Sequence, residues 1–347
     1  MPEPARATSD VGAIAARLLG RAVQSAEPAA PGGNNRVYRI DTKDGAFALK
    51  FYPCQDDDRR DRLSQEYQGL EFLARYGIAG IPRPVARDPA LGCGLYEWID
   101  GVPIAGARVE PGPADVDAMV ALAGRLAALA DESHAGALAP ASAHCFSGAA
   151  VAAQLAERLA RLHNVAAKED ALAPFLDDEF APRVEPLLRR AKDVYAEASL
   201  DFGTELRPPA LTLSPSDFGF HNALRTRDGG IAFVDFEYFG WDDPAKMVSD
   251  ALWHPGSTFS PTLARRFRVG AGRIFEDREG DSFAVRLEAL HPLFGMIWCL
   301  ILLNEFLPER WRRRLAAGGT ADAGPARAKQ LAAARRLLAK VTEIADE

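Results

Sequence analysis

The chain has 347 residues, 48% of them hydrophobic, so it can bury a sizeable core and has the length of two lobes or domains. Its formal net charge of -7 and its pI near 5.5 argue against nucleic acid or an anionic membrane surface as the main partner, because both attract basic proteins. The same charge is compatible with a small cationic substrate.

Targeting and redox features are sparse. The four cysteines have no C-x-x-C spacing, which favours free thiols in a reducing cytosol over disulfides or a metal cluster. Residues 1–10 lack the apolar segment of a signal peptide. The longest apolar run, residues 293–303, is shorter than the roughly 20 residues that span a bilayer, so it predicts a buried helix. We expect a cytoplasmic protein without membrane contacts.

The first hundred residues alternate between one helix pattern and several strand patterns. A capped amphipathic helix is predicted over residues 10–23. A glycine-rich turn, residues 31–35, then leads into strands at 36–40 and 46–52. Backbone N–H groups of such a turn can cover phosphates, although an ordinary hairpin turn has the same composition.

Lys50 lies inside the apolar strand 46–52, where an unpaired ammonium group is costly. The alternative is a lysine at a strand edge whose ammonium group reaches solvent. The next helix offers Glu66, one turn before the core positions Leu70 and Leu73 and on nearly the same face. Its rival Glu71 falls about 140° away around the helix. The pattern therefore predicts a Lys50–Glu66 pair.

A strand at residues 95–101 ends this region, and an alanine-rich helix with one buried stripe begins near Pro113. We place the lobe boundary between residues 101 and 113. His134 and His144 lie in a linker of small residues and have no metal partner at helical spacing, which favours surface positions. Most of the remaining chain is predicted helical, at residues 149–164, 178–198, 261–275, 281–306 and 326–344, with a further helix after Pro244 that carries Met247, Asp250 and Trp253.

The most informative stretch is residues 211–250. Asp217 is followed five positions later by Asn222, and a turn then leads through an apolar strand to Asp235. A two-residue hairpin loop at Asp228-Gly229 places Asn222 opposite Asp235. A loop at Gly229-Gly230 instead shifts the register by two residues, which still leaves the side chains of Asn222 and Asp235 on one face of the hairpin.

An amide oxygen and a carboxylate at the end of a short hairpin form a hard-oxygen site suited to Mg²⁺. Asp217 is then free to orient an attacking hydroxyl. The competing interpretation is an Asx-turn at Asp217, a strand-end Asn222 and an edge carboxylate at Asp235.

Together, Asp217, Asn222, the Val234-Asp235-Phe236-Glu237 step and the segment from Gly240 to Asp250 resemble the aminoglycoside phosphotransferase and choline kinase-like family. The resemblance implies an α+β, bilobal protein-kinase-like fold, with a small antiparallel β-sheet lobe carrying a helix and a larger, mostly α-helical lobe. It divides the chain into a nucleotide-binding lobe at residues 1–100, with a hinge near 95–101, and a catalytic and acceptor-binding lobe at 101–347.

The resemblance also implies roles for individual residues. Asp217 is the catalytic residue, and Asn222 and Asp235 hold Mg²⁺ against the phosphates of ATP or another nucleoside triphosphate. The nucleotide-binding residues are Lys50, Glu66, Gly33 and Asn35, together with hinge residues Glu97, Trp98 and Ile99, unless the hinge is an ordinary edge strand. Glu237 is expected to assist the metal or bind a cationic acceptor. Asp250 is expected to tie its helix to the catalytic loop.

The implied activity is phosphoryl transfer from ATP to the hydroxyl of a small molecule, such as a cationic amino alcohol or an aminoglycoside. Tryptophans and nearby acids can frame a pocket for an ammonium group, although aromatic residues at helical spacing also build hydrophobic cores. The candidate residues for such a pocket are Trp241, Trp253, Trp298, Trp311, Asp242, Asp243, Glu305 and Glu309.

One departure supports a rival function. Members of the family usually have a His-Gly-Asp motif at the position where this chain has Pro215-Ser216-Asp217, and proline lacks both an imidazole and a backbone N–H donor. The rival is a catalytically weak nucleotide-binding pseudokinase that regulates a partner, unless His221 compensates. A protein kinase is disfavoured, because H-R-D and A-P-E motifs are absent from the sequence.

Overall fold

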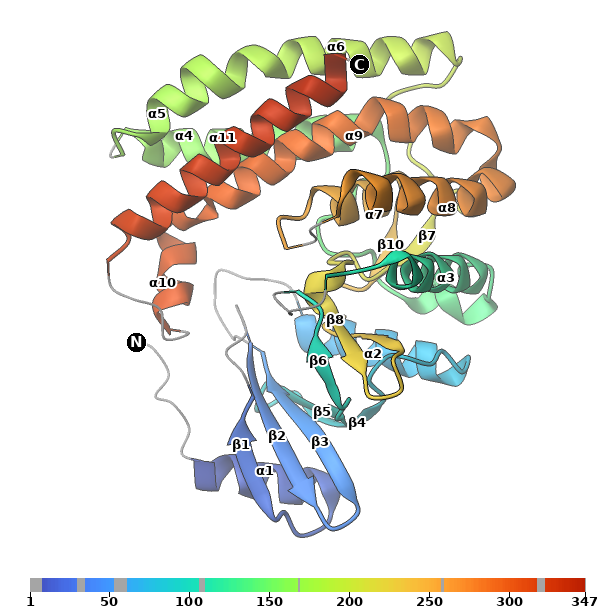
Figure 1. Cartoon of the computed structure of the whole chain (residues 1–347), viewed down its shortest axis with the longest axis vertical. Coiled ribbons are helices and arrows are strands. Elements are labelled where there is room, and N and C mark those ends of the chain that lie inside the picture. Colours follow the sequence, from blue (N-terminus) through green and yellow to red (C-terminus); the bar gives the residue numbers. More distant parts are fainter. Residues whose placement is uncertain are drawn as a thin grey trace.

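The computed structural model describes residues 8–29, 35–52, 61–105, 110–167, 169–256, 259–316 and 322–346. A small β-sheet lobe lies at one end of the molecule and a larger helical lobe at the other (Figure 1). The structure therefore has the bilobal α+β architecture of the kinase-like fold, as the sequence predicts.

The small lobe is built on a five-stranded antiparallel sheet with the strand order β1-β2-β3-β5-β4. Its strands are β1 (Ser25–Pro28), β2 (Arg36–Thr42), β3 (Gly45–Phe51), β4 (Pro84–Asp88) and β5 (Cys93–Glu97).

Helices cover both faces of this sheet. α1 (Thr8–Leu19) packs Val11 and Ala15 against Ile40, Leu49 and Leu95. α2 (Arg62–Arg75) packs on the opposite face, toward the second lobe. Because strand side chains alternate between faces, Lys50 points to the side of α2 while Leu49 points to α1.

α1 ends earlier than the predicted residue 23. Gly20 follows its last helical residue with a φ of 64°, the left-handed conformation that commonly terminates a helix. The start of α2 also follows a local signal, since the Asp61 carboxylate accepts a hydrogen bond from the N–H of Ser64 at 3.0 Å.

Short strands connect the lobes. β6 (Gly101–Pro103) pairs with β8 (Ala223–Thr226), which pairs with β9 (Ile231–Phe233). Separately, β7 (Thr212–Ser214) pairs with β10 (Gly240–Asp242), so the approach to Asp217 is fixed to the segment after Asp235.

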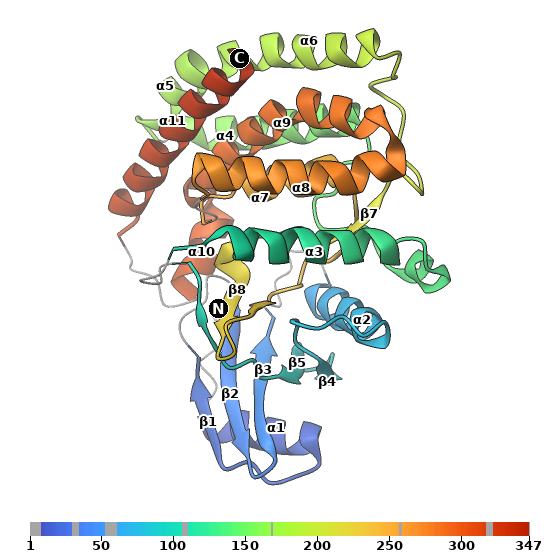
Figure 2. The same cartoon turned by 45° about the vertical axis from the view of Figure 1, so that its right-hand side comes forward.

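The second lobe is a set of layered helices, with α3 crossing beneath the others and facing the small lobe (Figure 2). Its longer helices are α3 (Pro113–Leu129), α4 (Gly148–Ala166), α6 (Ala181–Glu197), α7 (Pro244–Trp253), α8 (Pro261–Glu279), α9 (Asp281–Leu302), α10 (Pro308–Ala316) and α11 (Gly324–Asp346). Short helical turns are η1 (Ser133–Ala137), α5 (Leu172–Pro174), η2 (Phe175–Phe180), η3 (Phe220–Asn222) and η4 (Leu303–Phe306).

α9 is the central helix of this lobe and packs against α4, α6, α7, α8 and α11. The segment Asp281–Phe306 is the one helix of the described chain long and apolar enough to cross a membrane, and 72% of its most apolar window is buried inside the protein. This agrees with the predicted buried helix at its centre.

Candidate active site

Lys50 and Glu66 form a buried ion pair at the junction of the lobes. Lys50 Nζ lies 2.6 Å from Glu66 Oε2 and 2.5 Å from Asp235 Oδ1, and the lysine side chain is 8% exposed. Burial by itself lowers the pKa of Lys50, but the charges of Asp235, Glu66 and Glu237 outweigh burial and raise the pKa above its usual value. The lysine therefore remains charged, paired with the acid predicted from its helix face.

Glu66 also joins α2 to the segment after Asp235. Its Oε1 accepts the backbone N–H of Phe236 at 3.1 Å, and its Oε2 accepts the Tyr52 hydroxyl at 2.5 Å. The neighbouring Gln65 side chain donates to the carbonyl of Phe239 at 2.9 Å. Glu71, the rival candidate, lies on the exposed side of α2.

Glu237 is the centre of a second buried group. Arg62 Nη1 lies 3.1 Å from its Oε1, and Asn35 Nδ2 donates to its Oε2 at 2.7 Å. Both members of the Arg62–Glu237 pair have side chains only 3% exposed. Asn35 stands at the start of β2, so this acid links the turn before β2, α2 and the Asp235 segment. Gly33, the other residue predicted in that turn, lies outside the described residues.

Asp217 follows β7 through a tight backbone reversal. The Asp217 N–H bonds the Pro215 carbonyl at 2.8 Å around Ser216, whose φ is 64°. This is a γ-turn of the rarer, positive-φ form. Ser216 is secured by its N–H to Ser214 Oγ at 2.9 Å and by its hydroxyl to the Ser142 carbonyl at 3.2 Å.

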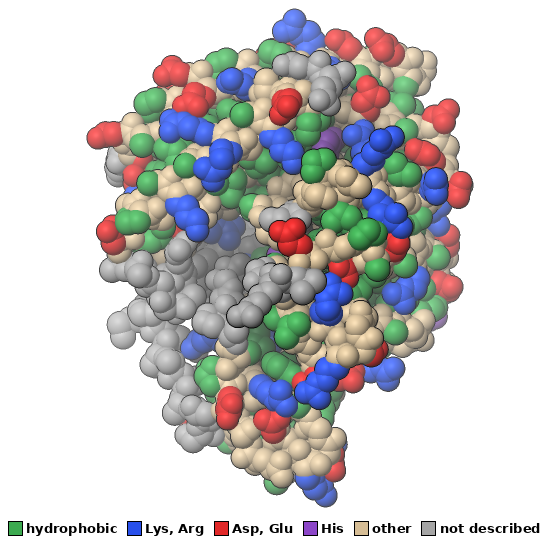
Figure 3. All heavy atoms as spheres, viewed as in Figure 1, with side chains coloured by type: hydrophobic (Ala, Val, Ile, Leu, Met, Phe, Trp, Pro, Cys, Tyr) green, Lys and Arg blue, Asp and Glu red, His purple; other side chains and the backbone are tan. Residues whose placement is uncertain are grey.

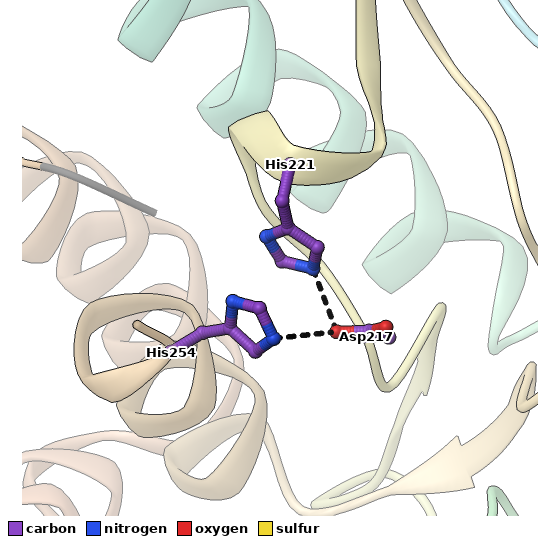
Figure 4. Close-up of side chains that lie close together, drawn as sticks. All are labelled: Asp217, His221 and His254. Atoms are coloured by element: carbon purple, nitrogen blue, oxygen red, sulfur yellow. Dashed lines mark hydrogen bonds and ion pairs between the residues drawn. The ribbon is translucent and has the colours of Figure 1, made fainter. Parts of the chain in front are cut away.

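The Asp217 carboxylate faces two histidines (Figure 4). His221 Nε2 lies 2.7 Å and His254 Nε2 3.6 Å from Asp217 Oδ1. Burial tends to raise the pKa of Asp217, but the hydrogen bond and charge of His221 and the proximity of His254 lower it below its usual value. Asp217 is therefore an ionised carboxylate, the state required to accept a proton.

The hairpin after Asn222 has a different register from the predicted one. Ala223 pairs with Phe233 and the Val234 N–H bonds the Asn222 carbonyl at 2.9 Å, so Asn222 lies opposite Val234 and not Asp235. The prediction of a two-residue loop was wrong. The turn has three loop residues, because Thr226 bonds Gly230 across it and Gly229 adopts a φ of 82°.

The oxygen atoms of Asn222 and Asp235 fit a hard divalent cation. Asn222 Nδ2 donates to the Asp217 carbonyl at 3.0 Å, which fixes the amide and leaves its Oδ1 as the available ligand. The Asp235 side chain is 35% exposed, with Oδ1 held by Lys50. An amide oxygen and a carboxylate of this kind suit Mg²⁺, which binds through few protein ligands and retains water or phosphate oxygens. The assignment of both residues as metal ligands stays a prediction.

Two of the three backbone N–H groups of the predicted hinge form hydrogen bonds within the small lobe. The Glu97 N–H bonds the Arg83 carbonyl at 2.8 Å and the Trp98 N–H bonds the Ala46 carbonyl at 3.2 Å. Ile99 is half-buried and, among the hydrogen bonds of the described residues, its N–H has no protein acceptor. Of the three predicted hinge residues, Ile99 is thus the one with a backbone donor available to a base.

In the part of the chain that the structure describes, the expected ammonium pocket is not assembled from all of the predicted residues. The Trp241 indole donates to the Ala135 carbonyl and that of Trp253 to the His291 carbonyl, and both rings are buried in the core. Three of the four acids form ion pairs within the protein: Asp242 pairs with Lys246, Asp243 with Arg286 and Glu309 with Arg161. The alternative of core aromatics holds for Trp241 and Trp253.

Asp250 has a different role from the expected one. Its Oδ2 pairs with Lys246 at 2.7 Å and its Oδ1 accepts the Trp298 indole N–H at 2.8 Å. These contacts fix α7 to α9, and both partners, Lys246 and Trp298, lie outside the catalytic loop. The reason is the buried Lys246 one turn earlier on α7, which attracts both Asp242 and Asp250.

Sequence reasoning missed several residues of the site. Arg62 lies one turn before Glu66 on the same face of α2, so helix spacing could have found it. Tyr52 and Tyr96, whose hydroxyls lie 2.7 Å apart, could have been found by strand alternation from Lys50. His254 follows Asp217 by 37 positions, and only the fold brings the two together.

A sheet lobe, a helical lobe and a buried lysine–glutamate pair at their junction define the kinase-like class of folds. Within that class the chain belongs to the phosphotransferase enzyme family, whose model matches residues 25–283.

Several solved structures of similar fold are small-molecule kinases. The chain is similar to the spectinomycin phosphotransferase APH(9)-Ia in complex with ADP and spectinomycin, with a TM-score of 0.61 at 12% identity, covering 96% of this chain and 100% of that one. For choline kinase LicA from Streptococcus pneumoniae the TM-score is 0.57 at 15% sequence identity, covering 96% of this chain and 98% of that one. For Plasmodium vivax ethanolamine kinase the TM-score is 0.53 at 13% sequence identity, covering 90% of this chain and 82% of that one. At these identities the likeness shows the fold.

One curated protein matches a shorter segment. The EKC/KEOPS complex subunit BUD32 of Chaetomium globosum is 36% identical over 83 residues, or 21% of this chain. The match spans about a third of that relative's length, 31%.

Proposed function

We propose that the protein is a Mg²⁺- and ATP-dependent kinase that phosphorylates the hydroxyl of a small, amine-bearing molecule. The observation that carries the proposal is the convergence of the buried Lys50–Glu66 pair with the partly exposed Asp235, beside a loop that presents the ionised Asp217. Phosphoryl transfer asks mainly for placement and charge neutralisation, which such a cluster supplies.

In this proposal each residue has one task. Lys50 uses two of its three N–H donors on Glu66 and Asp235, and its third reaches a nucleotide phosphate. Asn222 and Asp235 would hold Mg²⁺, which supplies neutralisation of the phosphate charge when bound. Asp217 accepts the proton of the acceptor hydroxyl. The half-buried Ile99 binds the edge of the base through its backbone.

Support for an amine-bearing acceptor comes from the named substrates of proteins with this fold, choline, ethanolamine and spectinomycin, and from the net charge of -7. On the face in Figure 3, basic and acidic side chains are interspersed over both lobes.

A direct test is ADP release from Mg-ATP with choline, ethanolamine, spectinomycin and gentamicin, and with neutral sugars as a comparison set. Asp217→Ala should abolish acceptor-dependent release while leaving the affinity for a fluorescent ADP analogue unchanged, because Asp217 touches the acceptor and not the nucleotide. Nucleotide binding with no turnover on any acceptor would favour the pseudokinase instead. A protein that does not bind the analogue at all would contradict both functions.

A further inference from the structure

The two histidines beside Asp217 form a stacked pair. Their ring centroids lie 3.6 Å apart with an angle of 18° between the planes, and both direct Nε2 toward the same carboxylate oxygen (Figure 4). The side chains of His221 and His254 are 13% and 19% exposed, so water competes only weakly for their N–H groups. One oxygen of Asp217 thus receives both imidazole contacts.

The hydrogen bonding of His254 decides what its ring can do. The Gly256 backbone N–H donates to His254 Nδ1 at 3.0 Å, so Nδ1 is an acceptor and the proton of the neutral ring resides on Nε2. Burial lowers the pKa of His254 to about 4, which keeps the ring neutral near pH 7. The Nε2–H therefore faces the Asp217 carboxylate.

The same contact argues against a metal ion in this cluster. Asp217, His221 and His254 offer ligand atoms that all lie within 4.8 Å of one another, a spacing compatible with a metal. Metal binding through His254 Nε2 would move the ring proton to Nδ1, where the Gly256 N–H already points.

A chain of contacts holds His254 in place. Its ring and the Trp298 ring form a T-shaped contact, with centroids 4.7 Å apart and an angle of 86° between the planes. The Trp298 indole N–H donates to Asp250. Asp250 pairs with the buried Lys246, which pairs with Asp242. Through these contacts α7 and α9 fix a ring that faces the catalytic loop, so His254 is supported from outside that loop.

We propose that His221 and His254 are positioning residues that jointly hold Asp217 Oδ1 and thereby present Oδ2 to the acceptor hydroxyl. This inference rests on the proposed function. In the step itself, the acceptor hydroxyl loses its proton to Oδ2 while its oxygen bonds to the γ-phosphorus, and the bond between that phosphorus and the β,γ-bridging oxygen breaks to release ADP. His254 remains a neutral ring with its proton on Nε2 throughout this step.

The test compares His221→Leu, His221→Gln, His254→Leu and His254→Gln. The readouts are hydrolysis of Mg-ATP, with water as the phosphoryl acceptor, and affinity for a fluorescent ADP analogue. We expect each leucine variant to lower kcat by about 10- to 100-fold, because a misplaced carboxylate loses its alignment. The KM for ATP and the analogue affinity should stay unchanged, and His221→Gln should recover most of kcat because its amide N–H can replace Nε2–H.

A matched control is His163→Leu. His163 Nε2 lies 3.0 Å from Asp177 Oδ1, but this pair is exposed on the second lobe, and its loss should leave kcat unchanged. The inference is overturned by leucine variants of His221 and His254 that hydrolyse ATP at the wild-type rate. It is equally overturned by variants that weaken nucleotide binding as much as they lower kcat, since that result would indicate a structural role.

A second measurement separates this inference from the proposed function. The chain has six histidines, so their imidazole ¹⁵N NMR signals can be assigned by substitution. His254 is expected as the Nε2–H tautomer, and Asp217→Asn should shift the signals of His221 and His254 but not of His163. Unchanged signals for both rings would refute the positioning role. Absence of ATP hydrolysis and nucleotide binding in the wild type, with these shifts present, would refute only the kinase function.

Discussion

Replacing Lys50 by methionine should destabilise the protein and weaken nucleotide binding together. The substitution keeps most of the side-chain volume and removes one charge from a cluster in which Glu66 and Glu237 are almost fully buried. Removing one partner of a buried ion pair typically costs about 3–5 kcal/mol, because it leaves an uncompensated charge. Glu66 keeps two donors, from Tyr52 and Phe236, and Asp235 is partly solvated, so we expect about 3 kcal/mol, at the lower end of that range.

The assay is urea unfolding at pH 7, followed by tryptophan fluorescence and read as a shift in midpoint at constant slope. Lys192→Met on α6 is the matched control: this lysine is exposed, and its loss should change stability by less than about 0.5 kcal/mol. The double variant Lys50→Met/Glu66→Gln should recover part of the loss, because it removes both charges. A Lys50→Met cost below about 1 kcal/mol, or a double variant whose costs simply add, would refute the account of a coupled buried pair.

Three further outcomes are expected. Asp235→Asn should raise the Mg²⁺ concentration needed for half-maximal ATP turnover by about 10-fold or more, measured by metal titration; an unchanged titration would exclude it as a ligand. Gly240→Ala should cost about 1–3 kcal/mol, because its Cβ would lie 2.3 Å from the Ala139 carbonyl oxygen, whereas Gly136→Ala, with nothing within 4 Å, should be nearly neutral in the same urea assay. Burial lowers the pKa of His291 from 6.5 to about 3. As the pH falls below 6.5, the unfolded chain protonates this histidine while the folded chain does not, so the free energy of unfolding should decrease by about 1.4 kcal/mol per pH unit. His291→Gln should flatten this dependence in a series of Tm measurements from pH 7 to pH 4, and an unchanged slope would contradict it.

Local patterns predicted the parts of the site that depend on one element. Lys50 was found because a charge in an apolar strand needs a partner, and Glu66 was preferred over Glu71 by its angle on α2. The strands of the small lobe and the helical character of the second lobe also follow from periodicity. Each of these features depends on residues within one strand or one helix, so the periodicity of the sequence predicts it directly.

Contacts between distant segments were not predictable in the same way. Asp243 and Glu309 pair with Arg286 and Arg161 on other helices, and no spacing rule indicates that these two acids are neutralised within the protein instead of facing a ligand. His254 reaches Asp217 only because α7 places its C-terminal end beside the catalytic loop. Tertiary packing therefore decided which of the charged residues became available to a substrate.

The hairpin shows that strand register alone does not set the directions of Asn222 and Asp235. A shift of one residue turns every strand side chain to the other face, so the observed pairing of Asn222 with Val234 should by itself have separated Asn222 from Asp235. β9 ends at Phe233, however, and Asp235 adopts a φ of 68°, which breaks the alternation of side chains after the strand. Such a conformation costs about 1–3 kcal/mol for a residue with a side chain, and here the contact with Lys50 at 2.5 Å holds it. Ser216, with a φ of 64°, redirects the chain just before Asp217 in the same manner. The two acids assigned to the chemistry thus owe their directions to left-handed residues, one at each motif, and not to the strand pairing on which the sequence argument depended.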